Sequence, residues 1–158
     1  MPRTTPLLFM TFFLLLITLA HAGYRAGEYT YDRKDYITAF KEWQPLAEQD
    51  QALVQFNLGL RYLNGQGVPQ DYAQARNWWL KAAAQGHAHA QLGLGTLYAL
   101  GQGVPQDFVQ AHMWSNLAAA QIQGDATKLS GILIEIMTLS QIAEAQRLAR
   151  EWQTHHQQ

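Results

Sequence analysis

Hydrophobic residues recur at intervals of three and four along most of the chain, which is the period of an amphipathic helix. The first stripe begins after Lys34 and runs from Tyr36 to Ala47. Further stripes of this kind occupy 51–64, 72–85, 87–100, 108–121 and 126–137, and a last one runs from Thr138 or Ser140 to about Trp152. The pattern predicts seven helices in antiparallel pairs and no strand, which is an all-α fold.

The helical pattern contains an internal repeat. The motif GQGVPQD stands at 65–71 and again at 101–107, a spacing of 36 residues. The same offset pairs further positions, and the residues that we expect to be structural repeat positions are Gly59, Tyr62, Gly65, Gly67, Asp71, Ala75 and Trp78 with Gly95, Tyr98, Gly101, Gly103, Asp107, Ala111 and Trp114. Self-similarity at this period is typical of a solenoid, in which each unit buries its apolar face against the next. The fold class is therefore an α/α solenoid of antiparallel helix pairs.

Each residue of the repeated motif has a conformational role. Gly65 and Gly101 are placed to end a helix in the left-handed conformation, and the proline that follows forces extended backbone. Asp71 and Asp107 then cap the next helix, and a glutamine three residues later completes the pattern of a capping box. Glycine within a helix is costly, so Gly59 and Gly95 predict the close approach of a neighbouring helix backbone.

The repeat divides the chain into segments. Applied backwards, the offset matches the first helix to the second helix of a unit, so the array begins with half a repeat. After Gln121 the identity fades, and the last two stripes are typical of a capping pair. We expect a signal peptide at 1–22, a lead-in segment at 23–34, the repeats at 35–121 with full units starting near 51 and 87, capping helices at 122–153 and a polar tail at 154–158.

The N-terminal residues have the composition of a secretory signal. Arg3 precedes an apolar run from Leu7 to Ala20, and Ala20 and Ala22 are small residues at the positions that signal peptidase reads. The run is shorter than the roughly 20 residues that cross a bilayer. We expect cleavage after Ala22, no stable membrane span in the mature protein, and export to a bacterial periplasm, with release to the outside as the alternative.

The repeated pattern LG-x-x-Y-x-x-G-x-GV-x-x-D-x-x-x-A-x-x-W-x-x-x-AA, present at 58–83 and 94–119, resembles the Sel1-like repeat, a relative of the tetratricopeptide repeat. Departures are few, such as Ser115 at the position of Trp79. The resemblance implies a scaffold for protein complexes, often in bacterial envelope or signalling processes.

A solenoid offers a groove lined by the first helix of each pair, so we expect a protein or peptide partner to bind there. We also expect the protein itself to be a monomer. Arg61 is the first choice as a binding residue, because charged residues flanked by aromatics are common at interface hot spots. The positions that vary between the repeats give the candidate set: Phe56, Asn57, Leu60, Arg61, Asn64, Thr96, Leu97 and Leu100. The alternative is a secreted modulator or inhibitor of an envelope enzyme that uses an aromatic outer face with Trp43 and Trp79.

Enzymatic and metal chemistry find little support in the residue inventory. The chain has no cysteine, Ser115, Ser130 and Ser140 lack an evident base in sequence, and the Gly-x-Gly pair lacks the Gly-Lys of a phosphate loop. His87 and His89 are two residues apart and so point to different sides of a helix. His112 stands where the first unit has Arg76, which suggests a solvated site. The chain has 11 Lys and Arg residues against 12 Asp and Glu, and its basic residues form no run that could bind nucleic acid. We therefore expect no catalytic residue, no cofactor and no metal site.

Overall fold

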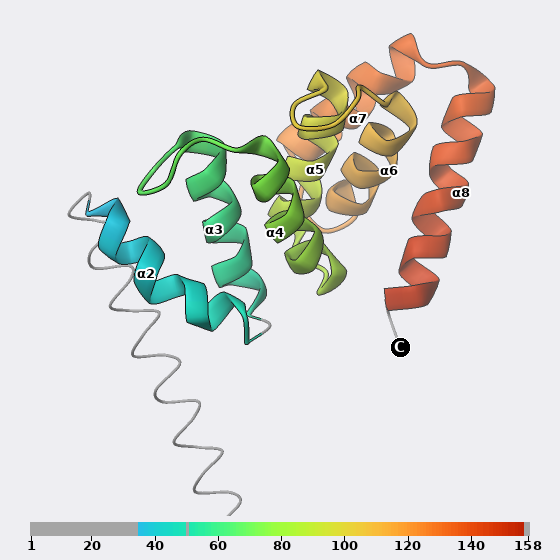
Figure 1. Cartoon of the computed structure of the whole chain (residues 1–158). Coiled ribbons are helices and arrows are strands. Elements are labelled where there is room, and N and C mark those ends of the chain that lie inside the picture. Colours follow the sequence, from blue (N-terminus) through green and yellow to red (C-terminus); the bar gives the residue numbers. More distant parts are fainter. Residues whose placement is uncertain (1–34, 50, 157–158) are drawn as a thin grey trace, which may run out of the picture.

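The computed structural model describes residues 35–49 and 51–156, so the predicted signal peptide and lead-in segment lie outside the described residues. The described residues form seven α-helices and no strand, as the pattern predicts. Figure 1 shows them stacked in order from α2 to α7, with α8 alongside α6. The helices are α2 (Tyr36–Ala47), α3 (Ala52–Asn64), α4 (Tyr72–Ala84), α5 (Ala88–Leu100), α6 (Phe108–Ala119), α7 (Asp125–Ile136) and α8 (Leu139–His156).

Two helical hairpins, α3 with α4 and α5 with α6, form the full repeats, and we call their first and second helices the A and B helices. α2 packs against α3 as the B helix of a half repeat. Its buried residues Ala39 and Trp43 match the buried Ala75 and Trp79 of α4 at the 36-residue offset. The half repeat predicted at the N-terminal end is therefore present in the packing.

The repeated loop closes each hairpin through several contacts. Gly65 and Gly101 adopt φ of 65° and 68°, and the carboxylates of Asp71 and Asp107 each accept the backbone N–H three residues later at 3.0 Å. The side chains of those two glutamines form no return bond to the caps among the described residues, so half of the predicted capping box is formed. Instead, Gln70 donates to the Leu63 carbonyl at 2.8 Å, and Gln106 does the same at Ala99.

Gly67 and Gly103 have a second role beyond their positive φ. A Cβ at Gly67 would lie 2.3 Å from the carbonyl oxygen of Tyr36, and one at Gly103 would lie 2.7 Å from the carbonyl carbon of Tyr72. Each loop therefore packs on the first turn of the preceding B helix, which couples one repeat to the one before it.

The two helical glycines of the A helices face different neighbours. A Cβ at Gly95 would lie 3.1 Å from the backbone oxygen of Ala111, which confirms the predicted approach of α6. At Gly59 the neighbour is instead the indole of Trp79, with Nε1 only 2.2 Å from the ideal Cβ position. Because Ser115 replaces Trp79 in the second unit, the α6 backbone can move into the space that the indole fills in the first.

α8 does not pair with α7. It packs mainly against α6, through the buried Ala145 and Ala149 and through Trp152, whose ring lies 4.6 Å from that of Trp114. The expected antiparallel capping pair is therefore wrong for these two helices, because α8 buries its apolar stripe on the second repeat.

α8 is also longer than predicted. Its first turn is capped by Thr138, whose Oγ1 accepts the N–H of Gln141 at 3.3 Å, and the Gln141 side chain accepts the Thr138 N–H at 2.9 Å. At the other end the helix continues to His156, so residues 154–156 of the expected tail are helical. Stacking of His156 on Trp152, with ring centroids 3.8 Å apart, stabilises this last turn.

Candidate interaction surfaces

Five of the eight predicted binding residues lie on one row of the A helices. The row follows positions four and three residues apart, so its side chains share a face of each helix. Asn64, Thr96 and Leu100 are exposed, and Leu100 keeps 60% of its surface open. Leu60, which matches Thr96 at the 36-residue offset, and Asn57, one turn earlier on α3, are half-buried. We call this set the A row.

The other three predicted residues hold helices together. Leu97 is buried in the core, and Phe56 stacks on Trp79 and on His87. Arg61 is only 3% exposed, with its guanidinium 5.6 Å from the Tyr36 ring centroid and 5.7 Å from that of Trp43. The choice of Arg61 as a surface hot spot is therefore wrong, because its aromatic neighbours come from α2 and cover it.

The A row continues onto α7, which sequence identity did not reveal. The buried residues Ala126 and Leu133 of α7 stand 36 residues after the buried Ala90 and Leu97 of α5, so α7 is a third A helix in the same register. Ile132 and Ile136 then fall at the A-row positions, where they are 58% and 57% exposed. The 36-residue offset could have revealed this register. The apolar stripe predicted for 126–137 did not do so, because it treated the buried and the exposed apolar residues of this helix as one face.

Trp43 and Trp79 do not form the aromatic outer face that was proposed as an alternative. Trp43 and Trp79 are 2% and 3% exposed. The Trp79 indole lies between Gly59 of α3 and Gly93 of α5, and its Nε1 donates to the Phe56 carbonyl at 3.1 Å. Both tryptophans fill contacts between helices, so neither can contact an envelope enzyme.

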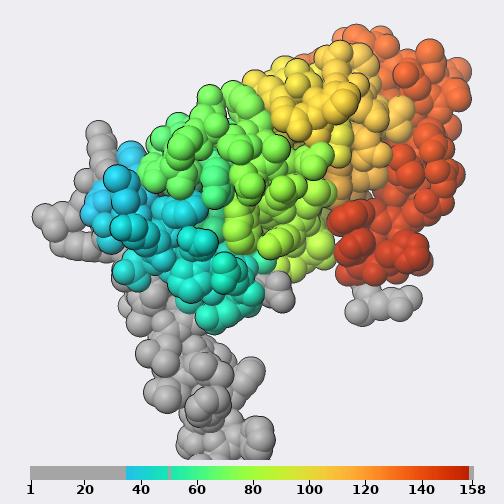
Figure 2. Space-filling view, in the orientation of Figure 1, coloured from blue at the N-terminus to red at the C-terminus, as the bar shows by residue number. Residues whose placement is uncertain are grey.

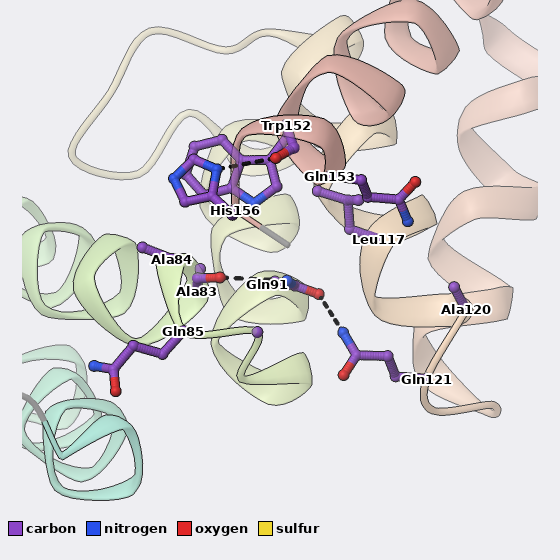
Figure 3. Close-up of a pocket in the computed structure, with 11 residues that line it drawn as sticks. Ala83, Ala84, Gln85, Gln91, Leu117, Ala120, Gln121, Trp152, Gln153 and His156 are labelled. Carbon is purple, nitrogen blue, oxygen red and sulfur yellow. Dashed lines mark hydrogen bonds between the residues drawn. The ribbon is translucent and has the colours of Figure 1, made fainter. Parts of the chain in front are cut away.

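Two cavities flank the C-terminal turns of α8, and they share Trp152 and His156. The first, of about 490 Å³, is the glutamine cavity. Figure 3 shows the stacked rings of Trp152 and His156 on one side of it, with Gln85, Gln91 and Gln121 on the opposite side. The second, of about 460 Å³, is the Trp114 cavity, and its walls include Leu80, Tyr98, Met113, Trp114, Leu148 and Glu151.

The glutamines belong to a clamp that repeats with the helices. The buried Gln91 donates to the Ala83 carbonyl at 3.4 Å and accepts from the Gln121 amide at 3.0 Å. One unit earlier, Gln55 donates to the Ala47 carbonyl at 2.9 Å and accepts from Gln85 at 2.8 Å. The clamp joins the ends of successive B helices. The sequence could have indicated it, because Gln55 and Gln91, and likewise Gln85 and Gln121, are 36 residues apart.

A serine and a histidine meet between α6 and α7. Ser130 Oγ lies 3.3 Å from His112 Nδ1 and donates to Asn116 Oδ1 at 3.4 Å. The Ser130 hydroxyl is therefore shared between the Asn116 amide and the His112 imidazole. His112 is 1% exposed, and burial lowers its pKa. The expected solvated site is wrong, and the pair fastens α7 to α6.

His87 is the N-cap of α5. Its Nδ1 accepts the Ala90 N–H at 3.2 Å, which requires a neutral imidazole. Burial, followed by the charge of His89, lowers the pKa of His87 and so favours that form. His87 is thus a structural residue.

Comparison with known proteins agrees with this geometry. The Sel1 repeat profile matches residues 52–87 and 88–121. A protective antigen present in uropathogenic Escherichia coli strains, which displays an SLR fold, is similar at 30% identity and a TM-score of 0.81 over 87% of this chain. A Sel1 repeat protein from Oxalobacter formigenes is similar at 32% identity and a TM-score of 0.68 over 74% of this chain.

The two relatives are longer. The chain spans 30% of the length of the first and 50% of the second. No curated protein matches the sequence. Two repeat matches, the 36-residue register of three A helices and the similarity to solved SLR structures lead to one conclusion: the chain contains two Sel1 repeats and folds as an SLR solenoid.

Proposed function

We propose that the protein is a non-enzymatic scaffold of the bacterial cell envelope that binds a segment of a partner protein along the A row. The observation that carries this proposal is the continuity of the row. Leu60 on α3 matches Ile132 on α7, and Leu100 on α5 matches Ile136 on α7, and all four retain exposed surface. Sel1 repeats are in general protein interaction modules, which supports the same assignment.

The chemistry of the row favours an apolar partner segment. Full burial of a Leu or Ile side chain contributes about 1.5–3 kcal/mol, and three of these residues are more than half exposed. Ordering both partners costs several kcal/mol, so we expect a Kd in the micromolar range from these contacts alone. The row positions on α5, Thr96 and Leu100, carry no charge, so a charged segment would gain nothing there.

The envelope assignment rests on the N-terminal sequence, with its single basic residue, apolar run and Ala20-His21-Ala22 site. Among the helices that the structure describes, none is long and apolar enough to cross a membrane. Cell fractionation followed by N-terminal sequencing tests the export. A product that starts at Met1 and stays in the cytoplasm contradicts it.

Site-specific photo-cross-linking in the native cell tests the binding surface. A cross-linker at Ile132 should capture the same protein as one at Leu100, and Leu100→Asp should abolish capture from position 132. The matched control is Ile37 on α2, which is 59% exposed but lies off the row. Equal capture from position 37, or capture from 132 that persists in Leu100→Asp, would refute the A row as the binding surface.

A further inference from the structure

The side of α8 that faces α4, α5 and α6 is only partly packed, and two cavities remain on it. α8 spans 18 residues, yet among its residues only Ala145 and Ala149 are buried. The glutamine cavity and the Trp114 cavity stay open on the two sides of the Trp152 and His156 rings. Figure 2 shows the red C-terminal end of α8 close to the green end of α4, across a gap of about 70 residues in sequence. The helix thus forms a cleft with the repeats and does not seal against them.

Trp114 lines the Trp114 cavity and carries a buried donor. Trp114 is 2% exposed, and its Nε1 has no hydrogen-bond partner among the described residues. A buried N–H without an acceptor is unfavourable, and a peptide carbonyl is an acceptor of matching size. The surrounding walls are largely apolar, from Leu80, Met113 and Leu148. Glu151 at the rim is already bound by Arg147. This cavity therefore suits an apolar side chain, and a carbonyl of the same segment would reach the indole N–H when the side chains around it shift.

The glutamine cavity presents acceptors instead. α4, α6 and α8 end beside this cavity, where Ala84, Ala120 and His156 line its wall, and the last carbonyls of a helix carry partial negative charge. The Gln121 amide nitrogen is held by Gln91, which leaves its oxygen as an oriented acceptor. Among the described residues that line the cavity, none is Asp, Glu, Lys or Arg. A cationic side chain complements this wall, whereas a carboxylate would be repelled.

We propose that the cleft under α8 binds an extended segment of a partner protein, with an apolar side chain in the Trp114 cavity and a nearby basic side chain in the glutamine cavity. Trp152 lines both cavities, so the two side chains lie on either side of it. An extended chain advances about 3.3 Å per residue and alternates its side chains, so two side chains on the same face are two residues apart, which is the spacing that we test. This surface is formed by α4, α5, α6 and α8 and does not depend on the A row.

The indole resonances of the protein provide a direct test. Titration with the blocked peptide acetyl-Gly-Leu-Gly-Arg-Gly-amide should shift the Trp114 Nε1–H signal downfield in a nitrogen-15 correlation spectrum, because that proton gains an acceptor. Trp78 is the internal control, since it occupies the same repeat position one unit earlier and lies over Lys81, away from α8. Its signal should stay unchanged. No shift at Trp114, or an equal shift at Trp78, would overturn the proposal.

Peptide and protein variants test the two anchors separately. The peptide with Glu in place of Arg should bind at least about fivefold more weakly, because it meets three helix C-termini. Gln153→Lys should weaken the Arg peptide and Gln153→Glu should strengthen it, since Gln153 lines the glutamine cavity at the surface. Leu148→Trp should block the apolar anchor, and Gln110→Trp repeats this from α6 in case the first variant disturbs α8. Equal affinity for both peptides, or undiminished binding in both Trp variants, would show that the cleft is not the site.

Discussion

Alanine at Gly59 and at Gly131 should change stability in opposite directions, although both glycines occupy the same repeat position of an A helix. At Gly59 a Cβ would lie 2.2 Å from Trp79 Nε1, which is too close for any contact, and the indole is buried between two helices. Gly131 has nothing within 4 Å of the same position, because α8 packs on α6 and leaves this side of α7 uncovered.

The magnitudes follow from the contacts. Overpacking at Gly59 costs about 1–3 kcal/mol, and displacement of the indole from the Phe56 carbonyl adds about 1 kcal/mol or more. Replacement of a helical glycine by alanine raises the free energy of unfolding by about 1 kcal/mol at either site through helix propensity alone. We therefore expect Gly59→Ala to lower the free energy of unfolding by about 2 kcal/mol, which corresponds to roughly 8 °C in Tm. Gly131→Ala should raise it by about 0.5–1 kcal/mol.

Thermal and urea unfolding followed by far-ultraviolet circular dichroism measures both changes. Near-ultraviolet signals report whether the environment of Trp79 changes in Gly59→Ala. The reasoning fails if Gly59→Ala is neutral, because the indole would then have free space to move. It fails equally if Gly131→Ala is destabilising, because α7 would then have a helix packed on that side.

Three further changes test other parts of the fold. Burial lowers the pKa of His87, so protonation favours the unfolded chain; the cap is intact above pH 6.5 and is lost as pH falls through the lowered pKa. His87→Asn keeps an N-cap worth about 1 kcal/mol that does not ionise, so it should reduce the difference between the urea midpoints at pH 7.5 and pH 5; an unchanged difference would show that His87 does not cause the pH dependence of stability. Gln91→Leu should cost about 1–2 kcal/mol because it removes the buried side-chain bonds to the Ala83 carbonyl and to Gln121, whereas Gln121→Leu at the exposed end should cost well under 1 kcal/mol, and equal costs would argue against the clamp. Gly103→Ala should lower Tm more than Gly86→Ala, since both have positive φ but only Gly103 packs on the preceding helix; equal losses would leave backbone strain as the whole effect.

The predicted binding residues separate according to how far their environment depends on distant helices. Asn64, Thr96 and Leu100 were placed correctly on an exposed face, because that depends on the local helical period. Arg61 was misplaced because Tyr36 and Trp43, which cover it, come from another helix. Sequence identity also stopped short of α7, where the register persists in burial although the residue types change.

The cleft under α8 could not be predicted from the sequence. Its walls come from four helices, and the partner of α8 is decided by the competition between α6 and α7 for one apolar stripe. Periodicity identifies the stripe but does not say which surface covers it.

The sequence by itself determined the helices, the 36-residue unit and the closing loops, because helix period, glycine conformation and capping act over a few residues. The tertiary structure alone decided that Trp43, Trp79, Arg61 and His112 are buried, that α7 extends the A row, and that α8 turns back over α6. These outcomes depend on which surfaces meet in space. The burial of a side chain depends on the residues that pack around it, and many of those residues are far away along the chain.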